Sequence, residues 1–546
     1  MDRLRDYIAI DFGTTNSLAY IYKNSGADCV PNMLQQGKFC FPSFVDYYKD
    51  HIQTGFDAKR YFGEKGHFVI AAVKRILGLD FQQYEEINDK SIFGCQIVEG
   101  DDGLPYFVVD EEGRQVSPIV VASYIFKEIK EAAEVYGGRE YQYAYVTVPA
   151  NYGDHQCKAI KKAAQLAGLE VEKLITEPTA AALSWCFDHL DDIQPKEKIV
   201  IYDFGGGTFD VSLVEYQEDG TFLVVDVDGN PCMGGNDIDR SLMDVLMEEY
   251  TKQYHSTKAE SVIEKKKSKR NKYRSECENI KILITNICHH YDDEESFIKN
   301  NLKHCQPFDF SFLDRNAGDV SCTPLMIQNA SRFIIENSVD ITVQLLDRNH
   351  FTPNDISRFF LVGGSSNLHL SKQLIHKTFT KVEFPDIEPD KAVAMGAMKM
   401  IINDILYPNR PLVKEKIVIS YGLQTSYDSV ALILKKGAYI PALSNDVTFT
   451  PLNDYEKEIY SVIYQWVGEP NTITDIVNGV SMVPVSECIR IDTLSFENMY
   501  PKTKDKQHFV IRFYIDFGGT LEVICKDNDE NEILSQKSFG AVYDGH

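Results

Sequence analysis

Three short segments carry glycines and small polar residues directly after apolar runs that predict β-strands. They are DFGTT at 11–15, DFGGGT at 203–208 and VGGSS at 362–366. Glycine leaves backbone N–H groups unobstructed, so each segment could bind a phosphate group. One such segment alone is usually a simple turn, but three of them, two with an aspartate at the same offset, favour a phosphate site. No G-x-x-x-x-G-K-[ST] motif occurs in the sequence, so the site would not be a P-loop.

The aspartates that begin two of these segments, Asp11 and Asp203, suit a magnesium ion. Mg²⁺ keeps several water ligands and takes one or two carboxylates together with substrate phosphates. A single aspartate at a strand end more often caps a turn. Because the arrangement is repeated, we expect these two carboxylates to be magnesium ligands.

The elements that must position these residues can be read from the pattern around them. Residues 7–22 and 199–215 each predict two short strands joined by a glycine-rich turn, which suggests an internally duplicated hairpin that holds phosphate. Between the two copies, 117–136 predicts a helix capped by Ser117 with Pro118 in its first turn, 143–150 predicts a strand and 154–168 a helix.

The following stretch, 236–285, is charged and predicts helix. It contains the basic run EKKKSKRNKYR at 264–274, whose ordinary explanation is a solvated helix face, the alternative being a phosphate or partner site. Further helices are expected at 324–349 and 389–406, and a buried strand at 359–364.

The character of the sequence changes near residue 407. The segment 407–416 is a polar linker with two prolines, and residues 417–546 alternate between short strands and turns without a long helix. We therefore expect one α/β domain at 1–406 and an all-β sandwich at 417–546.

Composition limits the partners. The 546 residues include 56 Lys and Arg against 81 Asp and Glu, a formal net charge of −25, which disfavours nucleic acid and anionic membranes as partners. No apolar run reaches membrane-spanning length, the N-terminus lacks a signal-peptide core, and the 12 cysteines form no C-x-x-C pair. The expectation is a cytoplasmic protein with reduced cysteines and no zinc site at His289 and His290.

The motifs DFGTTNS, VKRILG, VTVPA, EPTAAALSW, YDFGGGTFDVSL, MGGNDID, FLVGGSS and PDKAVAMGAM resemble, in order and spacing, the nucleotide-binding domain of the heat shock protein 70 family of DnaK-type chaperones. The resemblance covers about residues 6–403. It implies an α/β actin-like ATPase domain, with two ribonuclease-H-like lobes that close on Mg-ATP. Residues 417–540 resemble the family's peptide-binding β-domain more weakly.

The resemblance also implies roles for individual residues. It assigns ATP hydrolysis to Lys74, which would position the attacking water and the γ-phosphate, with magnesium at Asp11 and Asp203. Around them it implies the catalytic residues Glu177, Asp203, Thr208 and Asp210. It implies that ATP or ADP is bound by Gly13, Thr14, Thr15, Gly205, Gly206, Gly207, Gly234, Gly235, Glu278, Lys281, Thr285, Gly363, Gly364, Ser365, Asn367 and Asp390. Without the resemblance, Lys74 would be taken for an exposed helix lysine.

The sequence departs from the family pattern in several places. Where the family usually holds adenine between two arginines, Ile282 and Asn367 stand here, and we expect a loss of about 1–2 kcal/mol of binding free energy. The family usually has a Gln-Arg pair after the VTVPA segment, whereas this sequence has Gln156 followed by Cys157. The linker is basic and contains proline in place of an acidic run of leucines. Because the sequence ends soon after the last predicted strand, no helical lid is expected.

Three functions agree with these features. The first is a slow Mg-ATPase and chaperone that binds unfolded or extended peptides through its β-domain, assisted by a J-domain co-chaperone and a nucleotide-exchange factor. The alternative is an ATP-gated interaction protein, or a pseudo-ATPase scaffold, with one dedicated protein partner. A small-molecule kinase of the actin-like superfamily is the third, which the attached β-domain disfavours.

Overall fold

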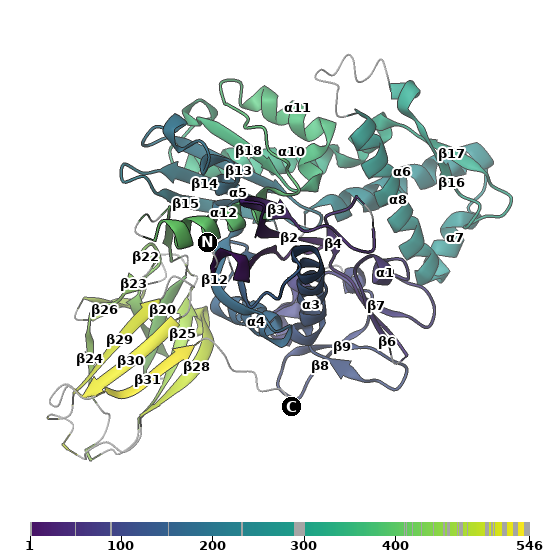
Figure 1. Cartoon of the computed structure of the whole chain (residues 1–546). Coiled ribbons are helices and arrows are strands. Elements are labelled where there is room, and N and C mark those ends of the chain that lie inside the picture. The colour runs from purple at the N-terminus through teal and green to yellow at the C-terminus, as the bar shows by residue number, and fades with distance from the viewer. Residues whose placement is uncertain are drawn as a thin grey trace. The chain divides into compact units, whose positions relative to one another are not determined.

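The structure is a computed structural model of the whole chain (Figure 1). It describes all residues except 1–2, 36, 50, 88–89, 151, 231–232, 289–300, 409, 411, 418, 427, 441, 451–453, 456–458, 467, 469–472, 478, 497–501, 504–505, 507, 516–520, 528–532 and 540–546. His289 and His290 therefore lie outside the described residues. The chain divides into two compact units. Unit 1 comprises Met1–Pro149, Ala163–Val171 and Ile175–Leu412, and unit 2 comprises Ala150–Lys162, Glu172–Leu174 and Val413–His546.

Two sheets of unit 1 repeat one arrangement. The first has the order β12-β11-β1-β2-β3, and the second contains the order β18-β13-β14-β15. In each, a glycine-rich turn joins an antiparallel hairpin, β1–β2 or β13–β14, and the first strand of that hairpin has a parallel neighbour, β11 or β18. The two predicted hairpins are thus confirmed. The strands are β1 (Tyr7–Asp11), β2 (Asn16–Lys23), β3 (Gly26–Cys29), β11 (Tyr143–Val148), β12 (Glu170–Thr176), β13 (Lys198–Phe204), β14 (Phe209–Tyr216), β15 (Phe222–Asn230) and β18 (Arg358–Val362).

The first long helix of this unit begins and ends at the residues that capping chemistry favours. Helix α3 (Pro118–Gly137) starts at Ser117, whose hydroxyl accepts a hydrogen bond from the Val120 N–H at 3.3 Å, and ends at the left-handed Gly138. Other helices of the chain are α4 (Asp154–Leu166), α5 (Glu177–Cys186), α10 (Pro324–Arg348), α11 (His369–Thr378) and α12 (Ala392–Leu406).

The predicted helical stretch 236–285 is divided into α6 (Gly235–Tyr254), α7 (Lys258–Lys265) and α8 (Lys267–Cys288). His255 adopts the left-handed conformation, with φ of 48°, and ends α6. Lys266 has an extended backbone and separates α7 from α8. The basic run therefore spans the end of one helix and the start of another.

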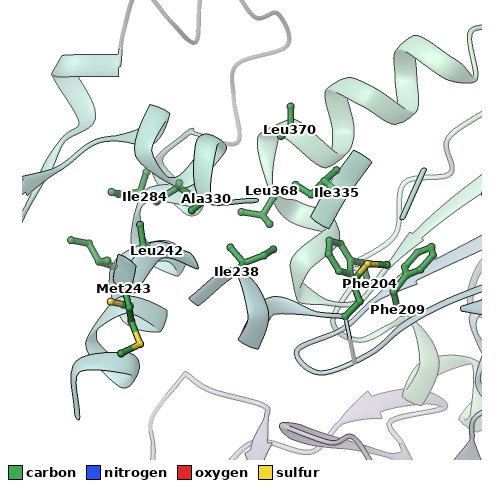
Figure 2. Packing of buried hydrophobic residues seen from close by; sticks show 14 of the residues in the cluster. Phe204, Phe209, Ile238, Leu242, Met243, Ile284, Ala330, Ile335, Leu368 and Leu370 are labelled. Carbon is green, nitrogen blue, oxygen red and sulfur yellow. The ribbon is translucent and has the colours of Figure 1, made fainter. Parts of the chain in front are cut away.

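A buried apolar cluster joins α6, α8 and α10 to the second sheet. Figure 2 shows part of this cluster, with Ile238 and Leu242 of α6, Ile284 of α8, Ile335 of α10 and Phe204 of β13. Each side chain of this size contributes about 1.5–3 kcal/mol when it is fully buried. The cluster therefore fixes α6 and α8 against the strands that end in glycine loops.

Smaller elements complete unit 1. They are β4 (Phe41–Pro42), β5 (Val45–Tyr48), β6 (His51–Thr54), α1 (Gly55–Lys59), β7 (Phe68–Ile70), α2 (Phe81–Glu85), β8 (Ile97–Glu99), β9 (Pro105–Val108), β10 (Gln115–Val116), β16 (Gln306–Asp309) and β17 (Asp319–Cys322). No helix among the described residues has both the length and the apolar character needed to cross a bilayer.

Unit 2 contains two antiparallel sheets that share a core. One has the order β26-β27-β21-β20-β25-β28, and the other has β23-β29-β30-β31 with β24 beside β29. Strand β29 alternates buried and partly exposed residues, and its buried Phe513 belongs to the same cluster as Leu423 and Ile463 of the first sheet. The strands of these two sheets are β20 (Ser420–Ser426), β21 (Ser429–Leu434), β23 (Ala442–Leu443), β24 (Val447–Phe449), β25 (Ile459–Trp466), β26 (Asp475–Val477), β27 (Val480–Pro484), β28 (Cys488–Phe496), β29 (Phe509–Ile515), β30 (Leu521–Asp527) and β31 (Ile533–Phe539). Two further short strands, β19 (Val413–Lys416) and β22 (Tyr439–Ile440), pair with each other outside these sheets.

Candidate functional site

A cavity of about 390 Å³ opens in unit 1 where the three glycine-rich segments meet. Most of the residues predicted from the sequence line it, although they come from distant parts of the chain. Those that do are Asp11, Gly13, Thr14, Thr15, Lys74, Glu177, Asp203, Gly205, Gly206, Gly207, Thr208, Gly235, Glu278, Lys281, Thr285, Gly363, Gly364, Ser365, Asn367 and Asp390. Asp210 and Gly234 do not line it. Asp210 is paired opposite Asp203 in the β13–β14 hairpin, and Gly234 packs behind the second loop.

The first glycine loop is a tight turn between β1 and β2. The Gly13 N–H donates to Ser17 Oγ at 3.2 Å, and Ser43 Oγ donates to the Gly13 carbonyl at 2.7 Å. A Cβ atom at Gly13 would lie 1.9 Å from the Asn16 carbonyl oxygen, so no other residue fits. This close approach explains the glycine.

The second glycine loop, at 203–208, is hydrogen-bonded to the start of α6 and to the third glycine loop, at 362–366. The N–H groups of Gly235 and Asn236 donate to the carbonyls of Gly205 and Gly206 at 3.0 and 2.7 Å. Ser365 Oγ donates to the Gly205 carbonyl at 2.9 Å. These bonds fix the loops relative to one another before any ligand arrives.

Lys74 is buried beside these loops. It lies in a short 3₁₀ turn, Val73–Arg75, is 6% exposed, and its Nζ lies 2.6 Å from Glu177 Oε1. A lysine that is removed from water needs such a partner. Because Lys74 is buried and lies in a 3₁₀ turn, the interpretation of Lys74 as an exposed helix lysine is wrong. The neighbouring Arg75, which sequence reasoning did not single out, donates to the Gly207 carbonyl.

Three buried aspartates close to Lys74, namely Asp11, Asp203 and Asp210, have raised pKa values. Burial, and then the charge of Glu177, raise the pKa of Asp11 to about 6, although Lys74 and the Thr147 hydroxyl oppose the shift. Burial and the same glutamate raise the pKa of Asp210 to about 7. Burial, followed by the charges of Glu177, Asp210 and Asp11, raises the pKa of Asp203 well above its usual range.

Four carboxyl groups thus share a single ammonium in a buried space. A divalent cation would supply the missing positive charge, so the residues fit magnesium. Across the described ranges, no three His, Cys, Asp or Glu side chains form a group that could hold a metal ion by themselves. The predicted ion requires only one or two carboxylates, the rest of its ligands being water and phosphate.

Helix α8 forms another wall of the cavity. Glu278 lies 2.9 Å from Lys59 Nζ, and the pKa of Glu278 is lowered by Lys59 and Lys281 in spite of its burial. Lys281 lies 2.6 Å from Asp239 and donates to the Gly235 carbonyl at 2.9 Å. Sequence reasoning missed two of these partners. Asp239 lies in the quoted motif MGGNDID, whereas nothing in the sequence around Lys59 indicated its role.

Taken together, the cavity offers backbone N–H groups for phosphates, carboxylates for a cation, and a buried lysine. A phosphoryl transfer reaction with a loose transition state needs mainly positioning and neutralisation of charge, which these groups supply.

Comparison with known protein families gives one finding. A family model described as Hsp70 protein matches residues 7–537. The match starts at the first residue of β1 and ends within β31, so it includes all three glycine loops and the two packed sheets of unit 2.

Proposed function

The chain belongs to the Hsp70 family, whose members are ATP-binding chaperones with ATPase activity, and from this we propose that it hydrolyses Mg-ATP in the cavity of unit 1 and binds extended peptide segments through unit 2. The observation that carries the proposal is the buried Lys74–Glu177 pair beside three interlocked glycine loops. A buried charged pair in a cavity is a feature of catalytic sites, and this pair places a fixed positive group beside the loops that would bind the phosphates.

Each part of the cavity has a role in this reaction. Backbone N–H groups of the three loops bind the phosphates. Asp11 and Asp203 would hold magnesium, which when bound neutralises phosphate charge. Lys74 orients the γ-phosphate and the attacking water, and Glu177 fixes the lysine. Thr208 completes the surroundings of the transferred group, and Asp210, which does not line the cavity, positions Thr208 by accepting a hydrogen bond from its hydroxyl.

The repeated sheet arrangement supports an actin-like fold with two ribonuclease-H-like lobes. Each proposed lobe contributes one glycine-rich hairpin to the cavity. We place the ATPase domain at 1–406, the linker at 407–416 and the peptide-binding domain at 417–546.

Unit 2 supplies apolar surface for a peptide. Leu443, Tyr460 and Ile476 are 58%, 63% and 64% exposed on three of its strands. An extended peptide can add main-chain hydrogen bonds at a sheet edge while its side chains contact such residues. A J-domain co-chaperone and a nucleotide-exchange factor would be further partners of the chain.

Calorimetric titration of ATP, with and without Mg²⁺, tests the nucleotide part of this proposal. We expect binding to the wild type to strengthen with Mg²⁺, and Asp203→Asn to lose most of that gain while it still binds ATP. The matched control is Asp340→Asn, on the exposed side of α10, which should titrate like the wild type. The absence of ATP binding to a folded wild type would refute the proposal.

A further inference from the structure

The second glycine loop cannot fix its own conformation, because residues 205–207 are three consecutive glycines. Glycine adopts many backbone conformations, so each peptide unit of this run could turn either its C=O or its N–H group toward the cavity. A phosphate needs the N–H groups. Contacts from outside the run must therefore select the orientation.

The carbonyl groups of the run supply these contacts. Those of Gly205 and Gly206 accept hydrogen bonds from backbone N–H groups at the start of α6. The Gly207 carbonyl accepts its hydrogen bond from Nη2 of Arg75, which is 132 residues away along the chain. In a planar trans peptide the N–H group points opposite to the C=O group. The bond from Arg75 therefore turns the Thr208 N–H away from the guanidinium, and Thr208 lines the cavity.

The guanidinium of Arg75 lies close to both of the first two glycine loops. Arg75 is partly buried, and a Cβ atom at Gly207 would lie 3.0 Å from its Nη2 atom and 3.2 Å from Thr14 Cγ2. Its charge also reaches the first turn of α6. Burial raises the pKa of Asp237 there, and the charges of Arg240 and Arg75 oppose that rise. Arg75 thus lies where the two loops and α6 meet.

The turn that carries Arg75 also carries Lys74. Arg75 follows Lys74 directly in the 3₁₀ turn Val73–Arg75. Lys74 Nζ lies 2.6 Å from Glu177 Oε1, while Arg75 donates to the Gly207 carbonyl. The turn therefore links the second glycine loop to the buried lysine, and a displacement of either would displace the other.

We propose that Arg75 is a positioning residue for ATP hydrolysis, which holds the Gly207 carbonyl so that the Thr208 N–H faces the phosphate site and which fixes this loop relative to Lys74. The inference rests on the proposed function, since it presumes that phosphates bind at the glycine loops.

This role affects the rate of hydrolysis more than the affinity for ATP. Most of the backbone N–H groups that would bind the phosphates are held by other contacts, so the loss of one bond weakens binding little. The reacting groups must be placed more accurately, because a misplacement of about 1 Å can slow a reaction by about a hundredfold.

The test compares ATP affinity with single-turnover hydrolysis of Mg-ATP. Arg75→Ala should hydrolyse ATP at least about tenfold more slowly than the wild type, while its dissociation constant for ATP stays within about fivefold. The matched control is Arg315→Ala, because Arg315 is exposed in the loop between β16 and β17. It should leave both values unchanged.

Chemical rescue separates positioning from a purely structural role. Millimolar guanidinium ion should accelerate hydrolysis by Arg75→Ala at least about threefold, because this planar cation can occupy the space of the missing side chain. It should not accelerate the wild type or Arg315→Ala. Hydrolysis by Arg75→Ala at the wild-type rate would overturn the inference, and so would equal losses of rate and affinity that guanidinium does not restore.

A second variant keeps the test decisive should Arg75→Ala not fold. Arg75→Lys keeps the charge but replaces the planar fork of donors with a single ammonium on a different stem. It should hydrolyse ATP at least about threefold more slowly, with ATP affinity unchanged, and a wild-type rate would overturn the inference. In each of these cases hydrolysis by the wild type leaves the proposed function standing, whereas a wild type that hydrolyses no ATP would overturn both.

Discussion

At the scale of single residues, burial decides which charged groups can act. Lys74 and Glu177 are both largely removed from water and lie 2.6 Å apart. An exposed pair of this kind would contribute little, whereas a buried one holds the ammonium in one position. Because the developing charge of a transferred phosphoryl group must meet a fixed positive group, this pair is central to the proposed reaction.

Glu128 of α3 is predicted to make the stability of the protein depend on pH. Burial raises the pKa of Glu128 to about 7, and its Oε2 atom has no hydrogen-bond partner. A carboxyl whose folded pKa lies above its unfolded value stabilises the fold fully below pH 4.5, and this contribution is lost as the pH rises through about 7. Glu128→Gln should therefore raise the unfolding temperature at pH 8, by the equivalent of about 3 kcal/mol, and change it little at pH 5.

Thermal unfolding followed by circular dichroism at both pH values measures this effect. Glu140→Gln, at an exposed position beyond the end of α3, is the control and should show no such pH dependence. An equal change at pH 5 and pH 8 in Glu128→Gln would show that ionisation of this group is not the cause.

The sequence could predict the residues of the site better than their contacts. The glycine loops could be predicted from the sequence because the close approach of the backbone at positions such as Gly13 allows only glycine. The burial of Lys74 could not be predicted from its neighbours, because it depends on Glu177, which is 103 residues away. The same holds for Lys59 and Glu278, which are 219 residues apart.

At the scale of elements, α5 and α12 pack closely against each other at a glycine. A Cβ atom at Gly396 of α12 would lie 1.6 Å from the Ala180 carbonyl oxygen of α5. Gly396→Ala should force the two helices apart and destabilise the protein by about 1–3 kcal/mol or more, a loss that a denaturant titration would detect. Gly26→Ala is the control, because a Cβ atom there would meet nothing within 4 Å. A neutral Gly396→Ala would mean that the two helices are not packed this closely.

Elements with capping residues at their ends were predictable, and interruptions of helices were not. Ser117 and Pro118 indicate the start of α3 correctly, since both act within one turn. The division of 236–285 into three helices depends on His255 in a left-handed conformation, which no turn-forming glycine or proline indicates. The expected helix from Pro389 begins only at Ala392.

At the scale of the whole molecule, the proposal requires the two units to influence one another. A ligand of unit 1 can change peptide affinity in unit 2 only if it binds two states of the protein differently, and the effect must be reciprocal. We expect a fluorescent extended peptide to dissociate at least about tenfold faster with ATP than with ADP, a coupling of about 1.4 kcal/mol. Stopped-flow measurement of the release rate provides the test. Equal rates with the two nucleotides would show that the units work independently.

The order of motifs along the chain was enough to predict the family, because phosphate-binding turns restrict sequence strongly, and the family model confirms this prediction. The β-rich unit was less predictable. Its alternating pattern indicates strands, but inward and outward positions such as those of Phe449 and Ile463 depend on which strands pair. The structure places Ile463 in the core and packs the partly buried Phe449 against it.

Single-turnover hydrolysis of Mg-ATP by the wild type and by Lys74→Ala tests the central claim most directly. We predict slow but measurable release of phosphate by the wild type, and at least about a hundredfold slower release by Lys74→Ala, with ATP still bound by both. Wild-type protein that binds Mg-ATP without hydrolysing it, or a Lys74→Ala variant that hydrolyses at the wild-type rate, would contradict the account.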